Sequence, residues 1–160
     1  MKTGSNNLKL PSYLIPLILV VSIIGFSDAL YLTAKHFSGE APECSILQGC
    51  EVVTTSSYSE IYGIPVALLG VVYYLFIFLF TLWYKDSENE LYLQFFPWIS
   101  VLGLLASLWF VYLQMFVIRA ICQYCMLSAI TSTLIFILGM TIFGKTRKKK
   151  ENNGNSIDTV

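Results

Sequence analysis

Four long apolar stretches constrain the fold of this chain more than any other feature of its sequence. They run over about 13–32, 64–84, 95–117 and 121–143. A helix needs about 20 such residues to cross a hydrocarbon core about 30 Å thick. None of the stretches shows the polar–apolar alternation over about ten residues that marks a transmembrane strand. Because backbone groups in lipid must bond within their own structure, we expect four membrane-spanning helices.

The composition agrees with a membrane protein. The chain is 56% hydrophobic and only 12% charged, whereas a soluble domain carries about 25% charged residues. The predicted fold class is therefore an all-α, four-helix membrane bundle. The first stretch could instead be a signal peptide, with Ser27 and Ala29 near the cut. We favour a membrane helix, because the stretch exceeds the usual apolar core of about 7–15 residues and three spans follow it.

The connections divide the chain unevenly. An N-terminal segment, 1–12, precedes the membrane domain, 13–143, which contains one long loop at 33–63. The last segment, 144–160, begins with a basic cluster and continues with polar residues, so we expect it to be disordered. Loops as long as 33–63 are uncommon in compact domains and are often functional.

Basic residues predict the orientation in the membrane. With the N-terminus in the cytoplasm, Lys35 and Arg119 lie outside, and the other basic residues lie inside: Lys2, Lys9, Lys85, Lys145, Arg147, Lys148, Lys149 and Lys150. This distribution satisfies the positive-inside rule. Both termini are then cytoplasmic and the long loop is outside. The basic tail could also bind anionic lipid, but we favour a role as a topology signal.

Four cysteines form two close pairs, which this topology places on the same outer side. Cys44 and Cys50 lie in the loop sequence CSILQGC, and Cys122 and Cys125 form a CxxC unit that opens the fourth stretch. Disulfides form and persist outside the cytoplasm. The free amides and dipole at a helix start stabilise a thiolate, so Cys122 is expected to exchange readily. Cys125, one turn deeper, could meet a lipid-soluble oxidant such as a quinone.

Other uses of these cysteines are less consistent with the pattern. Four thiolates would satisfy tetrahedral zinc, but the Cys44–Cys50 spacing is wider than usual and an oxidising compartment disfavours zinc. Haem attachment needs CxxCH, and here Met126 follows the CxxC unit. A structural CxxC disulfide closes almost no loop and stabilises little. For the loop pair taken alone, a structural disulfide and an exchanging one stay open. We expect no metal and no nucleic-acid partner.

The order of these motifs resembles the bacterial vitamin K epoxide reductase (VKOR) family. The motifs are CSILQGC, SSYSEIYGIPVALLG and CQYC, and the resemblance covers roughly 13–143. It implies a four-helix bundle around a quinone, menaquinone or ubiquinone, in the bacterial inner membrane. The implied function is a thiol–quinone oxidoreductase. It would pass electrons from an exported thioredoxin-like protein through both cysteine pairs to the quinone, and so support disulfide bond formation.

The resemblance also implies roles for individual cysteines. Cys122 and Cys125 match the active-site pair, and Cys125 would react with the quinone. Cys50 matches the loop cysteine that attacks Cys122, and Cys44 matches the one that exchanges with the partner. Many bacterial members carry a fused thioredoxin domain. Since none is present in this sequence, we expect a separate, DsbA-like partner protein.

Four polar residues have two interpretations each. Ser56, or its neighbour Ser57, matches a serine near the quinone, but either could simply cap a short helix. Asp28 is either a functional intramembrane acid or an acid that reaches interfacial water. His36, the single histidine, could be a general acid, although a solvated loop residue is the interpretation we favour.

Two competing functions follow from the same features. A DsbB-type disulfide oxidase has a different fold but also four spans and two cysteine pairs. Its CxxC unit lies in the first outer loop, which is the reverse of the order here. A non-enzymatic membrane scaffold with two structural disulfides is the other alternative, and its two pairs would not react with each other.

Overall fold

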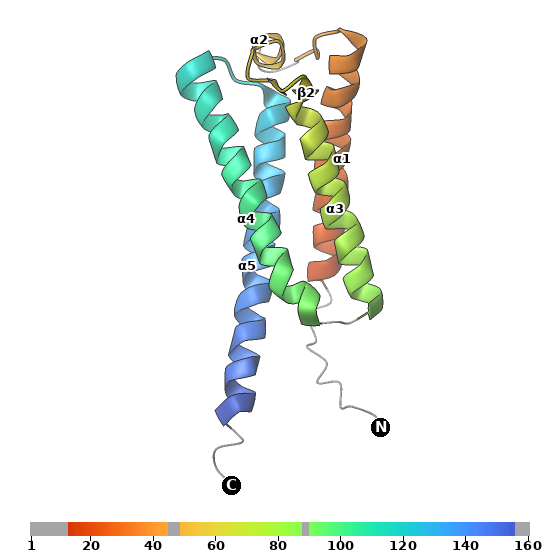
Figure 1. Cartoon of the computed structure of the whole chain (residues 1–160), viewed down its shortest axis with the longest axis vertical. Coiled ribbons are helices and arrows are strands. Elements are labelled where there is room, and N and C mark those ends of the chain that lie inside the picture. The colour runs from red at the N-terminus through yellow and green to blue at the C-terminus, as the bar shows by residue number, and fades with distance from the viewer. Residues whose placement is uncertain (1–12, 45–48, 88–89, 156–160) are drawn as a thin grey trace.

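The computed structural model describes residues 13–44, 49–87 and 90–155 (Figure 1). Its long helices are α1 (Leu14–Ser38), α3 (Val66–Ser87), α4 (Glu90–Tyr112) and α5 (Gln123–Asn155). At its end α4 continues directly into a π-helical turn, η1 (Leu113–Ile118). Figure 1 shows the long helices side by side, with α1 and α3 adjacent and α4 beside α5.

A small cap lies between α1 and α3 in the sequence and covers one end of the bundle. It contains a short helix, α2 (Cys50–Thr54), and an antiparallel hairpin of β1 (Glu60–Ile61) and β2 (Ile64–Pro65). The hairpin turn places Tyr62 and Gly63 in the left-handed region, with φ of 55° and 78°. The start of α1 and the end of α5 lie at the opposite end of the bundle (Figure 1).

Each long helix, with η1 added to α4, contains a segment that is long and apolar enough to cross a membrane. These segments are Leu14–Ser38, Val66–Lys85, Phe95–Ile118 and Gln123–Gly144. The predicted all-α bundle of four membrane helices is therefore confirmed. Large apolar side chains remain exposed along the outer sides of the helices, for example Leu102, Leu105 and Trp109 on α4. In a membrane protein, lipid covers such a surface.

The core lies where α1, α3 and α5 meet. Its most buried apolar side chains include Ile18, Ile77 and Ile135. Tyr74 of α3 is also buried, and its ring packs against Gly25 of α1, where a Cβ atom would come within 2.7 Å of the ring carbon Cδ1. The Tyr74 hydroxyl is hydrogen-bonded to α5 side chains, the nearest being Thr131 Oγ1 at 2.7 Å and Ser132 Oγ at 2.9 Å. Polar groups thus join α3 to α5 inside the bundle.

Several helix boundaries differ from those predicted from the sequence, and the ends of α1 and α5 differ most. Helix α1 continues to Ser38 and ends at Gly39, whose φ is 69°, so residues 33–38 of the predicted loop are helical. Helix α5 continues to Asn155, so the tail predicted to be disordered is helical as far as that residue. Lysine and arginine favour helix, and lengthening an existing helix needs no new nucleus. Segments 1–12 and 156–160 lie outside the described residues.

Candidate active site

The CxxC unit lies where η1 turns into α5. Arg119 ends η1 with a left-handed φ of 54°. Cys122 immediately precedes Gln123, the first residue of α5, and Cys125 lies in the first turn of that helix. The Cys122 side chain is fully buried and Cys125 is half-buried, and both are free thiols. The CxxC unit therefore opens the fourth membrane helix, as the sequence predicted.

A buried glutamine fixes the backbone of this turn. Gln114 of η1 is 2% exposed, and its Oε1 atom accepts the backbone N–H of Cys122 at 2.9 Å. The backbone carbonyl of Gln114 accepts the N–H groups of Arg119 and Ala120. Isolated π-helical turns often occur at functional sites. We did not identify Gln114 from the sequence. The available signal was an uncharged polar side chain inside an apolar span, where it needs a partner.

The loop pair forms a disulfide. Cys44 and Cys50 are bonded, and their Cα atoms are 5.9 Å apart. Cys50 opens α2 and is 1% exposed, whereas Cys44 is half-buried. Residues 45–48, which complete the loop between the two cysteines, lie outside the described residues.

The structure brings both cysteine pairs together. Cys50, Val53 and Cys122 form one buried apolar cluster, and Cys44 and Cys125 pack against it. Cys50 and Cys122 are the two almost fully buried members of this cluster. Thus all four predicted cysteines meet at one end of the bundle, although they come from distant parts of the chain.

Gly49 explains how α2 comes so close to the CxxC turn. A Cβ atom at Gly49 would lie 2.6 Å from both the backbone N and the backbone O of Ile121, next to Cys122. Only glycine leaves room for this approach of two backbones. A second link lies nearby, because the Tyr124 hydroxyl donates a hydrogen bond to the Glu43 carbonyl oxygen at 3.3 Å.

The surroundings of Cys122 favour its thiolate form. The Cys125 thiol donates a hydrogen bond to the Cys122 sulfur, and the backbone N–H groups of Cys125 and Tyr124 add to its effect. Burial opposes these hydrogen bonds, but together they lower the pKa of Cys122 to about 7. An ordinary cysteine has a pKa of about 8.5. In thiol–disulfide exchange a thiol of lower pKa leaves faster from a mixed disulfide, so Cys122 suits this chemistry.

Ser56 lies just after α2. Its Oγ atom donates a hydrogen bond to the Val53 carbonyl oxygen at 2.7 Å, so it stabilises the end of α2 and not the start of a helix. Ser56 also lines a cavity of about 550 Å³ between the segment 51–58 and the end of η1. Neither Cys122 nor Cys125 lines this cavity.

The remaining polar candidates lie on α1. The His36 Nε2 atom is 3.3 Å from Glu60 Oε1, so His36 ties the end of α1 to the hairpin. It is a helical residue and not a loop residue. Asp28 is 7% exposed, and its side chain interacts electrostatically with Cys122 and Cys125. This burial disfavours the interpretation of Asp28 as an acid at the water interface.

A four-helix membrane bundle with a disulfide packed against a CxxC dithiol has the arrangement of a membrane thiol oxidoreductase. A model of the vitamin K epoxide reductase family matches residues 16–140. The chain therefore belongs to the vitamin K epoxide reductase family. The DsbB-type alternative lies outside this family. A comparison with curated proteins finds no match. Membership of this family supports a multi-pass membrane protein that is, in general terms, a thiol–quinone oxidoreductase.

Proposed function

We propose that this chain passes electrons from an exported, thioredoxin-like protein through its two cysteine pairs to a quinone in the membrane. The observation that carries the proposal is the shared buried cluster of Cys50 and Cys122. An electron relay needs these sulfurs close together, because exchange proceeds by attack of a thiolate on a disulfide sulfur. A scaffold with two structural disulfides has no need of such packing.

The first exchange takes place at the loop pair. Cys44 is half-buried while Cys50 is 1% exposed, so Cys44 is the sulfur that a partner thiolate reaches first. The partner thiolate attacks the Cys44 sulfur, and Cys50 leaves as a thiolate. The second thiol of the partner then displaces Cys44 from this mixed disulfide, and the partner leaves with a new disulfide. Cys44 and Cys50 become thiols and hold the two electrons. The partner in this scheme is a separate, DsbA-like protein.

The second exchange moves the electrons to the CxxC unit. The Cys50 thiolate attacks Cys122 of an oxidised CxxC unit, and Cys125 leaves as a thiolate. Cys44 then attacks Cys50 and releases Cys122, so the loop disulfide is restored and the CxxC unit is reduced. The described pairing, a Cys44–Cys50 disulfide beside two free thiols, corresponds to the state after this exchange.

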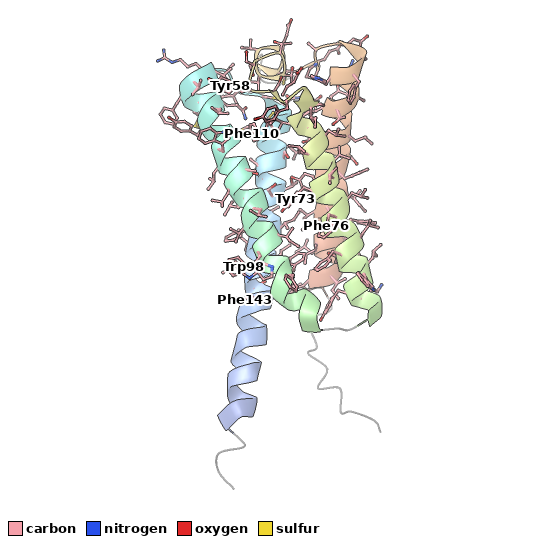
Figure 2. All side chains as sticks on the ribbon, viewed as in Figure 1. Tyr58, Tyr73, Phe76, Trp98, Phe110 and Phe143 are labelled. Carbon is pink, nitrogen blue, oxygen red and sulfur yellow. A yellow bond between two sulfur atoms is a disulfide. The ribbon has the colours of Figure 1, made fainter. Side chains whose placement is uncertain are left out.

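The surroundings of the CxxC unit fit a quinone, which would act as a two-electron acceptor when bound there. Cys125 lies inside the membrane-spanning segment that begins at Gln123, where a lipid-soluble molecule can reach it. The Tyr73 hydroxyl of α3 is buried beside Gly103 of α4, and it has no hydrogen-bond partner among the described residues (Figure 2). A buried donor in an apolar setting suits a quinone oxygen.

We therefore assign three residues to the quinone site. Cys125 is the reacting thiol, and Tyr73 is a hydrogen-bond donor. Ser56 keeps the role that the family resemblance implies, because its cavity reaches Ile118, which packs against the cluster of Cys50 and Cys122. Either menaquinone or ubiquinone satisfies these requirements.

We further propose that the cap faces the outside of the bacterial inner membrane and that both termini are cytoplasmic. The start of α1 and the end of α5 lie at the end of the bundle opposite the cap, which is consistent with this orientation (Figure 1). Lys85 near the end of α3 lies at the same end, with the basic cluster of α5. In this topology, the membrane domain covers 13–143.

Quinone reduction by the purified full-length chain in detergent tests the proposal. With a small dithiol as donor, wild type should reduce menaquinone or ubiquinone analogues, whereas Cys122→Ser and Cys125→Ser should not. Cys44→Ser should keep activity with the small dithiol and lose it with a reduced thioredoxin-like donor. If wild type is inert with both quinones and both donors, the proposed function is wrong and the scaffold alternative is favoured.

A further inference from the structure

Asp28 is a buried acid that the electron relay leaves unexplained. Its side chain is 7% exposed, and neither carboxylate oxygen has a hydrogen-bond partner among the described residues. Other buried polar side chains of α1 are satisfied: Ser22 Oγ donates to the Ile18 carbonyl at 2.6 Å, and Thr33 Oγ1 donates to the Ala29 carbonyl at 2.7 Å. An unpaired acid inside a membrane bundle is costly and marks a functional residue.

The position of Asp28 points to the CxxC unit. The titratable groups within its electrostatic range at the start of α5 are Cys125 and Tyr124 of that helix and Cys122 just before it. One turn earlier on α1, Gly25 packs against the ring of Tyr74, a titratable side chain of α3. Where the structure describes the chain, the two ion pairs are Lys35–Glu40 and His36–Glu60, so no basic side chain neutralises Asp28.

We propose that Asp28 accepts the proton of the Cys125 thiol when the CxxC dithiol is oxidised, and passes it on to the reduced quinone. This inference rests on the proposed function. Cys125 lies within a membrane-spanning segment, so its proton needs an acceptor inside the protein. A side-chain base can act directly or through one water, and contacts that are long in the free enzyme shorten during reaction.

The step balances in electrons and protons. The thiols of Cys122 and Cys125 form one S–S bond and give up two electrons and two protons. The quinone takes both electrons and two protons and becomes a quinol. The Cys125 proton passes through Asp28, which ends the cycle unprotonated. The Cys122 proton leaves to water at the outer end of the bundle, and the same water supplies the second proton of the quinol.

Two measurements on the full-length chain in detergent test this role. The first omits quinone: the reduced CxxC unit is oxidised with a small disulfide while infrared difference spectra are recorded. In wild type, the C=O stretch of a protonated carboxylic acid should appear on oxidation. It should be absent in Asp28→Asn and shifted in Asp28→Glu. Ser22→Ala, which removes a buried polar group from the same helix, is the matched control and should keep the wild-type band.

The second measurement is the single-turnover rate of quinone reduction by pre-reduced protein. General acid–base catalysis contributes about 100-fold or more, so Asp28→Asn should slow the reaction by about that factor. Asp28→Glu and Ser22→Ala should stay close to wild type. Formation of a disulfide between Cys50 and Cys122 should be unchanged in Asp28→Asn, which shows that the variant is folded.

The opposite outcomes would overturn the inference. If Asp28→Asn is as fast as wild type or faster, Asp28 acts only as a nearby negative charge. If the wild-type spectrum lacks a carboxyl band that depends on Asp28, the proton does not pass through it, whether or not Asp28→Asn folds. If wild type fails to reduce quinone, the proposed function and the transfer to quinone are wrong, and the infrared band still decides whether Asp28 takes the proton.

Discussion

The two cysteine pairs meet at one end of the bundle, but the protein holds them in different ways. The CxxC pair lies where the turn after one membrane-spanning segment leads into the next one. The buried side chain of Gln114 accepts a hydrogen bond from the backbone N–H of Cys122. The loop pair belongs to the cap, whose threonine and serine hydroxyls donate hydrogen bonds within their own segment. Thr54 Oγ1 donates to the Cys50 carbonyl and Ser56 Oγ donates to the Val53 carbonyl.

This difference suits a relay with a fixed and a movable partner. Among the described residues, the cap meets the CxxC turn through apolar packing and through a hydrogen bond from Tyr124 to Glu43. Segments with mostly local hydrogen bonds open at a lower free energy than a bundle core. The cap can therefore open and expose Cys44 to a protein partner. The turn meanwhile holds Cys122 and Cys125 at a fixed position at the start of the membrane helix.

Gly49→Ala should have the largest effect on the contact between the two cysteine pairs, because the added Cβ atom would collide with the backbone of Ile121. Overpacking costs about 1–3 kcal/mol, and about 1.4 kcal/mol is a tenfold change in an equilibrium. We expect formation of a Cys50–Cys122 disulfide to slow by about tenfold or more. Quinone reduction with a small dithiol should persist. The measurement is the rate of disulfide formation in a variant that keeps only Cys50 and Cys122.

The matched control for this change is Gly144→Ala, because a Cβ atom at Gly144 would meet nothing within 4 Å. It should leave the rate of disulfide formation unchanged. Equal rates in Gly49→Ala and in wild type would show that α2 does not need its close approach to the turn.

Gln114→Leu should destabilise the turn that holds the CxxC pair. The backbone N–H of Cys122 would lose its buried acceptor, which costs about 1–3 kcal/mol. We expect the free energy of unfolding to fall by that amount in denaturant titrations. Gln114→Glu keeps an acceptor oxygen and should retain more stability than Gln114→Leu. If the leucine variant is as stable as wild type, the hydrogen bond to Cys122 does not fix the turn.

Cys125→Ala should change the acidity of Cys122 without moving its backbone. Cys122 has a pKa of about 7, and the hydrogen bond from Cys125 is the largest cause. In wild type, its alkylation rate should rise as the pH increases through about 7. Without that donor the midpoint should move up, toward the ordinary thiol value of about 8.5. The pH dependence of alkylation by a small maleimide measures this, and an unchanged midpoint would contradict the assignment.

Tyr124→Phe should have the smallest effect. It removes the hydrogen bond to Glu43, which is long at 3.3 Å, and keeps the ring that packs against Tyr31 with centroids 5.0 Å apart. A typical hydrogen bond contributes about 0.5–1.5 kcal/mol, and this exposed one should lie near the lower value. Hydrogen exchange of cap amides should therefore be slightly faster. Loss of the whole cap in this variant would show that one hydrogen bond, and not apolar packing, holds it.

The sequence predicted those features that local hydrophobicity and spacing determine. The four spans follow from the length of apolar runs, and the CxxC unit at a helix start follows from its place beside the fourth run. The contact of Gly49 with Ile121 and the bond from Gln114 to Cys122 were not predicted. The first depends on packing between distant segments, and the second depends on the shape of the turn between η1 and α5. No local hydrophobic pattern encodes either of them. The ends of α1 and α5 were missed because polar residues can continue a helix that apolar residues have begun.

The central claim is that Cys50 and Cys122 react with each other, and trapping their disulfide tests it most directly. The double variant Cys44→Ser/Cys125→Ser leaves only these two cysteines, and Cys50→Ser/Cys125→Ser leaves Cys44 and Cys122 as the matched control. After mild oxidation, mass spectrometry of the digested protein should identify a Cys50–Cys122 peptide in high yield. The Cys44–Cys122 peptide should form far more slowly. Absence of the Cys50–Cys122 disulfide, or equal yields from both variants, would contradict the relay.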